Sequence, residues 1–177
     1  MLQIRPTIKN QDIAGQMTTR DYNDCVDRNA DGVYRFILKN LKDEHDAQDV
    51  VQNAFEKLWI NHNKVAAEKA KSYLFTTAYH TMIDHIRKAK AVGSLEDMPE
   101  TGSSTLNDYT DIGEILDEAL EKLNEIQRSV LLLRDYEGYS YKEIGDITGL
   151  NEAQVKVYIY RARTFLKGYL VSPEHIL

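Results

Sequence analysis

The chain has 177 residues, enough for one ordinary domain or two small ones, and 42% of them are apolar, which excludes a disordered chain. No run of eighteen apolar residues occurs, and residues 1–20 lack an apolar segment, so the sequence predicts neither a membrane-spanning helix nor a signal peptide. Cys25 is the single cysteine, which excludes an internal disulfide and is typical of a reducing cytoplasm. Few prolines and much Ala, Glu and Lys indicate a soluble, intracellular, all-α protein.

The net charge of -6 argues against a nucleic-acid-binding protein, but this charge is unevenly distributed. Residues 91–121 hold nine acidic residues and no Lys or Arg, which outweighs the deficit of the whole chain. Local charge governs binding more than the total does. The rest of the chain is therefore still able to bind an anionic partner.

The first half of the chain predicts three helices, over residues 22–41, 45–60 and 72–89. The second has the clearest amphipathic pattern, with Val50 and Ala54 widening its apolar stripe. The stripe itself consists of Val51, Phe55, Leu58 and Trp59. The opposite side of this helix is polar and carries Asp49, Gln52, Asn53 and Glu56. Taken by itself, this side is either ordinary solvated surface or a docking face.

Residues 61–71 are polar and predict a loop or a frayed helix before the third helix. The third helix ends in Arg87, Lys88 and Lys90, and cations in a last turn favour the helix dipole. A mobile linker is expected over residues 92–110, which contain glycines, a proline and a Ser/Thr run.

The second half predicts helices over residues 115–123 and 126–136, the latter closed by Gly138. Ser140 and Glu143 have the spacing of a capping box at the start of a short helix that stops at Gly149. Asn151 then caps a longer helix, with Gln154 three residues later. A short helix, a glycine turn and a longer basic helix indicate a helix-turn-helix, whose second helix can enter the DNA major groove.

The last helix is expected to bury one side and expose a cationic one. The expected buried residues are Val155, Ile159, Ala162 and Leu166. The expected exposed residues are Lys156, Tyr158, Arg161, Arg163 and Lys167. The alternative is an ordinary helical hairpin with a solvated charged face. A local charge of plus three over residues 151–170, with Tyr158 and Tyr160 among the cations, favours DNA binding.

These two sets of predicted helices resemble the extracytoplasmic-function sigma factors of the sigma-70 family. The resemblance to that family's region four rests on Leu120–Leu123 (LEKL), Arg128–Arg134 (RSVLLLR), Glu137–Ile144 (EGYSYKEI), Val155-Lys156 and Arg161–Arg163 (RAR). The resemblance to region two rests on Asp46–Phe55 (DAQDVVQNAF), Leu58-Trp59, Tyr73-Leu74, Ala78 and Ile83–Arg87 (IDHIR). The two blocks stand in the family's order, with a linker between them.

The resemblance implies two small helical domains joined by a flexible acidic linker. The implied divisions are an amino-terminal extension (1–20), region two (21–91), the linker (92–112), region four (113–171) and a tail (172–177). It implies a factor that directs core RNA polymerase to promoters, assists their melting and catalyses nothing itself. The implied partners are core RNA polymerase, through its β′ clamp helices and β flap, promoter DNA and an anti-sigma factor; no cofactor is implied.

The family's site residues carry over as three sets. Core polymerase binding maps onto Asp49, Gln52, Asn53, Glu56 and Trp59. Binding of the minus-ten element maps onto Lys64, Lys71, Ser72, Tyr73, Thr76, His80, Arg87 and Lys88. Binding of the minus-thirty-five element maps onto Glu152, Gln154, Lys156, Val157, Tyr158, Tyr160, Arg161, Arg163 and Lys167.

The chain departs from the family's pattern at three places. His80 stands where an Asn is common, Leu123-Asn124 replaces Leu-Pro, and Val157-Tyr158 replaces a Ser-Arg pair. An apolar group and a phenol in place of a hydroxyl and a guanidinium alter base preference. The promoter sequence therefore cannot be transferred from relatives.

Three other functions compete with this interpretation. An enzyme would need His80, Asp84 and His85. His80 and Asp84 have the spacing of metal ligands on one helix, but a third ligand is not evident and Asp84 is equally a partner for Arg87. A stand-alone helix-turn-helix regulator with a sensing or dimerising first domain explains the second half but not the polar side of the second helix. A helical adaptor without DNA binding leaves the basic helix unexplained.

Overall fold

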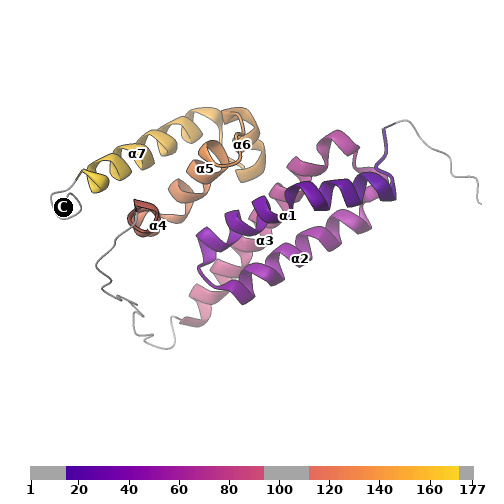
Figure 1. The fold of residues 1–177 in the computed structure, drawn as a ribbon, viewed down its shortest axis with the longest axis horizontal. Coiled ribbons are helices and arrows are strands. Elements are labelled where there is room, and N and C mark those ends of the chain that lie inside the picture. Colours follow the sequence, from indigo (N-terminus) through magenta and orange to yellow (C-terminus); the bar gives the residue numbers. More distant parts are fainter. Residues whose placement is uncertain (1–14, 94–111, 172–177) are drawn as a thin grey trace, which may run out of the picture.

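The computed structural model describes residues 15–93 and 112–171, and these residues form two groups of helices (Figure 1). The first group comprises α1 (Thr19–Leu41), α2 (Glu44–Ile60) and α3 (Ala70–Gly93). The second comprises α4 (Ile112–Lys122), α5 (Glu125–Asp135), α6 (Tyr141–Thr148) and α7 (Glu152–Leu170). The prediction of an all-α protein with two small helical domains is confirmed. None of the described helices is long and apolar enough to cross a bilayer.

Local side-chain chemistry sets the ends of the first three helices. Thr18 and Asp21 form a capping box at the start of α1, and the Asp43 side chain accepts a hydrogen bond from a backbone N–H of α2. Lys42 ends α1 in the left-handed region, at φ 63°, which allows the chain to reverse within two residues into α2. α1 and α2 therefore pack side by side, and α3 packs against both.

The buried side of α2 is turned relative to the predicted stripe. Ala47, Val50, Ala54 and Leu58 are buried, whereas Val51 and Phe55 are half-buried and Trp59 is 42% exposed. α2 packs against both α1 and α3, and Ala47 and Ala54 in its buried line let these helices approach closely. The larger side chains of the predicted stripe accordingly lie at the edge of the core.

The segment before α3 is more ordered than predicted. It forms two single-turn 3-10 helices, His62–Lys64 and Ala67–Lys69, with Val65 buried between them. The Val65 carbonyl accepts a hydrogen bond from the Met17 N–H at 3.0 Å. α3 also begins before and ends after the predicted bounds, so two residues assigned to the linker belong to it. Residues 94–111 of the predicted linker lie outside the described residues, and Ile112, the last residue assigned to it, begins α4.

The second domain confirms the predicted capping signals. Ser140 and Glu143 form the capping box of α6, Gly149 ends that helix at φ 79°, and Asn151 and Gln154 form the box of α7. The turn is tight, since a β-carbon on Gly145 would lie 2.6 Å from the Leu150 carbonyl oxygen. Glycine at that position lets α6 and the start of α7 pack as a helix-turn-helix.

The two domains pack against each other, a feature that the sequence did not predict. α4 and α5 contact α1, and α6 contacts α3. The apolar core is continuous across the boundary: the Phe75 ring lies 5.8 Å from that of Phe36 and 5.4 Å from that of Tyr139, centroid to centroid. Beside this aromatic contact, the buried Arg128 guanidinium of α5 donates to the Asn40 carbonyl of α1 at 3.2 Å.

Candidate functional site

α7 is fixed with one side against the second domain and the other side exposed. Val155, Ile159 and Ala162 are buried against α5 and α6. The predicted DNA-reading residues on the exposed side are Glu152, Gln154, Lys156, Val157, Tyr160, Arg161, Arg163 and Lys167. Tyr160 and Val157 are 71% and 45% exposed, which is unusual for large apolar groups and typical of a surface that meets a partner.

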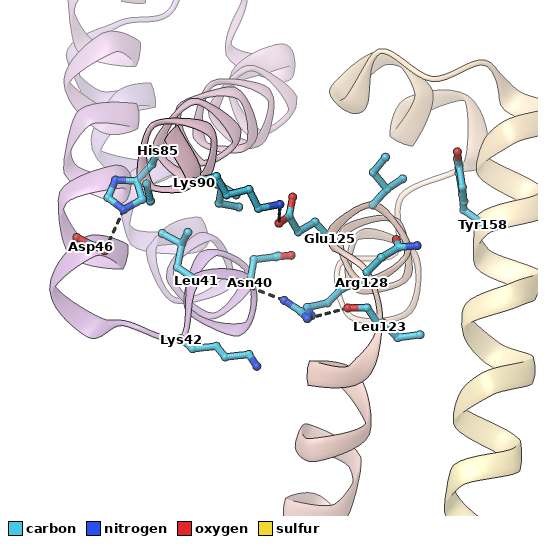
Figure 2. Close-up of a pocket in the computed structure, with 14 residues that line it drawn as sticks. Asn40, Leu41, Lys42, Asp46, His85, Lys90, Leu123, Glu125, Arg128 and Tyr158 are labelled. Carbon is cyan, nitrogen blue, oxygen red and sulfur yellow. Dashed lines mark hydrogen bonds and ion pairs between the residues drawn. The ribbon is translucent and has the colours of Figure 1, made fainter. Parts of the chain in front are cut away.

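Tyr158 is an exception, because it is half-buried and packs against the core rather than standing in solvent. It follows the buried Val155 by three residues, which places it on the same side of the helix. Figure 2 shows Tyr158 of α7 at the edge of the groove between the two domains. The predicted exposure of Tyr158 is therefore wrong, and its ring is directed toward the groove.

The charged side chains of α7 differ in how they are held. Lys156 Nζ lies 2.9 Å from a Glu152 carboxylate oxygen and 5.5 Å from the centre of the Tyr141 ring. Arg163 forms an ion pair with Asp135 of α5, and the hydrogen bonds that its guanidinium donates to this carboxylate raise the pKa of Arg163. Within the described part of the chain, Arg161 and Lys167 have no such partner. These two cations are free to meet phosphates.

The polar side of α2 forms a second exposed surface. Asp49, Gln52 and Glu56 are exposed, while Asn53 is half-buried and its side-chain oxygen is buried without a hydrogen-bond partner. A shallow groove of about 340 Å³ runs past Asp49 and Asn53 toward α3. Two carboxylates and the amide of Gln52 are therefore exposed along this side of α2, next to the groove.

Trp59 marks the end of this surface. Its ring stacks on His62 with centroids 4.6 Å apart and an interplanar angle of 9°, and it meets the edge of Tyr22 at 5.0 Å. Aromatic contacts on both sides hold the indole in place while leaving part of it exposed. The predicted set of polymerase-binding residues therefore shares one side of one helix.

The predicted minus-ten residues lie along α3 and the segment before it. Lys64, His80, Arg87 and Lys88 are exposed, and Lys71, Ser72, Tyr73 and Thr76 are half-buried. Residues 71 and 88 lie about 26 Å apart along the helix, at about 1.5 Å per residue. The Thr76 hydroxyl donates to the Ser72 carbonyl at 2.7 Å, which leaves only its acceptor side for a ligand.

The Asp84 side chain pairs with an arginine of its own helix. Its carboxylate lies 2.5 Å from the Arg87 guanidinium, the alternative noted from the sequence. No three His, Cys, Asp or Glu side chains in residues 15–93 and 112–171 lie close enough together to hold a metal ion.

Sequence reasoning missed the groove between the domains. It has a volume of about 690 Å³ and runs between the ends of α1 and α3 on one side and the start of α5 on the other (Figure 2). Within it, His85 Nε2 lies 2.9 Å from an Asp46 carboxylate oxygen, and Lys90 Nζ lies 2.6 Å from Glu125. The one sequence signal for this region was an arginine, Arg128, at the start of an otherwise apolar helix.

Comparison with known proteins identifies both halves of the chain. Residues 25–92 match the family model "Sigma-70 region 2", and residues 113–166 match "Sigma-70, region 4". The chain is 31% identical over 141 residues to the ECF RNA polymerase sigma factor SigM of Bacillus subtilis, across 77% of this chain and 86% of SigM. It is 30% identical to SigW of the same species, across 84% of this chain and 88% of SigW.

The fold is also similar to solved structures. The sigma factor RpoE of Bartonella quintana, solved in complex with the anti-sigma factor NepR, matches with a TM-score of 0.74 at 22% identity, across 87% of this chain and 99% of RpoE. CnrH, solved in complex with the cytosolic domain of CnrY, matches with a TM-score of 0.63. With both sigma regions matched in order, the chain belongs to the extracytoplasmic-function sigma factors of the sigma-70 family, which direct core RNA polymerase to promoters for transcription initiation.

Proposed function

We propose that the two domains divide the work of promoter recognition. Residues 21–91 bind core polymerase through α2 and the minus-ten element through α3, residues 113–171 bind the minus-thirty-five element through α7, and residues 92–112 connect them. The observation that carries this proposal is the exposed side of α7, which faces outward because Val155, Ile159 and Ala162 are buried on the opposite side. The chain itself catalyses no reaction and acts in the cytoplasm.

The polar side of α2 suits a protein partner better than DNA. It combines two exposed carboxylates, Asp49 and Glu56, with the amides of Gln52 and Asn53 and the indole of Trp59. Carboxylates repel phosphates, whereas an aromatic group next to polar groups is common at protein–protein interfaces. We assign this surface to the β′ clamp helices of core polymerase.

Asp49→Lys and Gln52→Ala are expected to weaken binding to core polymerase without lowering helical content, because both side chains are exposed. Fluorescence titration of labelled chain with core polymerase measures the affinity, and circular dichroism measures the helical content. Asp31→Lys is the matched control, since it makes the same charge change at an exposed position of α1. Equal affinities of the Asp49→Lys variant and this control would show that the surface is assigned wrongly.

Along α7 we propose a change from base contacts to phosphate contacts. The residues after Asn151 enter the groove first, as in other helix-turn-helix proteins. Gln154 uses its side-chain oxygen in the capping box, at 3.0 Å from the Asn151 N–H, so only its amide NH₂ is free to donate to a base. Lys156 lies two residues further along, and Lys167 lies about three turns beyond that, where the helix leaves the groove.

Lys156→Ala is therefore expected to cost about 1–3 kcal/mol of promoter binding and to relax preference at one base position. Lys167→Ala is expected to weaken all sequences alike and to reduce the salt slope by about one. Binding of the holoenzyme to single-base variants of the upstream element, at several salt concentrations, separates the two effects. If Lys167→Ala changes base preference and Lys156→Ala only flattens the salt dependence, α7 docks in another orientation.

An anti-sigma factor is a further proposed partner. RpoE was solved in complex with the anti-sigma factor NepR, and this chain has a similar fold. We also propose that the second domain binds the β flap of core polymerase. The match of the first domain to sigma region two, rather than to a sensing domain, argues against a stand-alone regulator.

A further inference from the structure

The exposed side of α7 carries no charge along its middle. The buried line of this helix consists of Val155, Ile159 and Ala162. Four exposed residues at spacings of three or four form a second line, the outer line: Ala153, Val157, Tyr160 and Thr164. At about 100° per residue, Val157 lies roughly 160° around the helix from both Val155 and Ile159. The outer line is therefore the part of α7 that reaches furthest from the domain.

Cations lie on both flanks of the outer line. Lys156 and Lys167 fall on one flank, Arg161 falls on the other, and all three are exposed. Lys156 is held on its flank by Glu152, at 2.9 Å. Phosphates line the two walls of the major groove, so a helix with cations on both flanks enters the groove with its middle line toward the base edges. The outer line is thus directed at the floor of the groove, where it offers no charge.

Val157 is the residue of the outer line that is best placed to touch a base. It lies in the second turn of α7, in the half of a recognition helix that enters the groove first. The Ala153 side chain is shorter, and Thr164 lies about two turns further on, with its hydroxyl donating to the Tyr160 carbonyl at 2.9 Å. The exposed isopropyl group of Val157 has neither a donor nor an acceptor. A favourable partner for it is an apolar part of a base edge.

In the major groove that apolar part is the C5-methyl group of thymine, because the other base edges present donors and acceptors. A valine against one of those polar edges would displace water without replacing its hydrogen bond. We propose that Val157 packs against the C5-methyl group of one thymine in the minus-thirty-five element, and thereby selects an A·T pair at that position. This inference rests on the proposed function, in which α7 binds that element.

Removing the methyl group from the DNA tests the inference without altering the protein. Each thymine of the element is replaced in turn by deoxyuridine, which keeps every donor and acceptor of the base and lacks only the methyl group. Fluorescence anisotropy measures binding of the holoenzyme, assembled from core polymerase and the full chain, to each duplex. Affinity is expected to fall about fourfold at one position, the effect of losing one buried methyl-sized group. If deoxyuridine lowers affinity nowhere while the holoenzyme still discriminates single-base variants, the inference is overturned and the proposed function stands.

Val157→Ala connects the methyl group to this side chain. The variant removes both γ-methyl groups at an exposed helical position, so we expect the fold to be retained. It should bind the thymine duplex about fourfold more weakly than the unaltered chain does, and deoxyuridine at the sensitive position should then change nothing. Val171→Ala is the matched control, because it makes the same change at an exposed position after α7, and it should keep full sensitivity to the methyl group.

The other outcomes contradict the proposal in distinguishable ways. Sensitivity to the methyl group that persists in the Val157→Ala variant assigns the contact to another residue and overturns the inference. Weaker binding of this variant to core polymerase without DNA would show that Val157 contacts a protein, which also overturns it. A holoenzyme that recognises no upstream element overturns the proposed function, and this inference with it.

Discussion

Phe75→Ala is expected to lower the free energy of unfolding by about 3–5 kcal/mol, the largest effect of any single truncation proposed for this chain. The Phe75 ring of α3 is fully buried and contacts Phe36 of the first domain and Tyr139 of the second. Its removal leaves a cavity that neither domain can close alone. Urea denaturation followed by circular dichroism measures the change.

Phe55→Ala is the matched control, because it removes the same ring from the same domain. Phe55 belongs to the apolar stripe predicted from the sequence, yet it is half-buried at the edge of the core. Its truncation is therefore expected to cost clearly less than that of Phe75. Equal losses of stability for the two variants would contradict the position of Phe55 at the edge of the core.

Arg128→Met is expected to lower the free energy of unfolding by about 3 kcal/mol or more, because each buried carbonyl left without a donor costs about 1–3 kcal/mol. The guanidinium donates to the carbonyls of Leu120, Glu121, Leu123 and Asn40, at 2.7–3.2 Å. Methionine fills much of the same volume but donates nothing. Urea denaturation again provides the measurement.

The charge of Arg128 is balanced by helix ends rather than by a carboxylate contact. Burial lowers the pKa of Arg128, and Glu121 and Glu125 oppose this shift. The carbonyls it meets lie at the carboxy-terminal ends of α4 and α1, where the helix dipoles favour a cation. Arg35→Met, at an exposed site of α1, should leave the free energy of unfolding nearly unchanged. A loss as large as that of Arg128→Met would show that the hydrogen bonds of Arg128 to the helix ends are not the cause.

The local features of the fold were predictable because nearby residues determine them. Ser140 with Glu143 and Asn151 with Gln154 are three residues apart, and each pair forms the capping box that its spacing predicts. The helices of the second domain consequently begin within a few residues of their predicted starts. The family resemblance then identified both domains, as the matched region models confirm.

The long-range features were not predictable from patterns along the chain. Arg128 donates a hydrogen bond to a carbonyl 88 residues away, at the end of α1. The spacing of apolar residues along a helix does not predict which other helix will lie beside it. The same applies to the buried side of α2. Because α2 packs against two helices, Ala47 and Ala54 lie in the middle of the contact and the more hydrophobic Phe55 lies at its edge. Tyr158 was predicted to lie on the exposed cationic side of the last helix. It follows the buried Val155 by three residues, however, and therefore lies toward the buried side of α7.

The most direct test of the central claim is transcription by core RNA polymerase from a genomic promoter library, with and without the chain. We expect a set of discrete start sites that appear only when the chain is added, and that share two upstream elements at a fixed spacing. The two elements correspond to the separate surfaces on α3 and α7. If no start site depends on the chain, or if dependent sites share no elements, the chain does not direct polymerase to promoters as proposed.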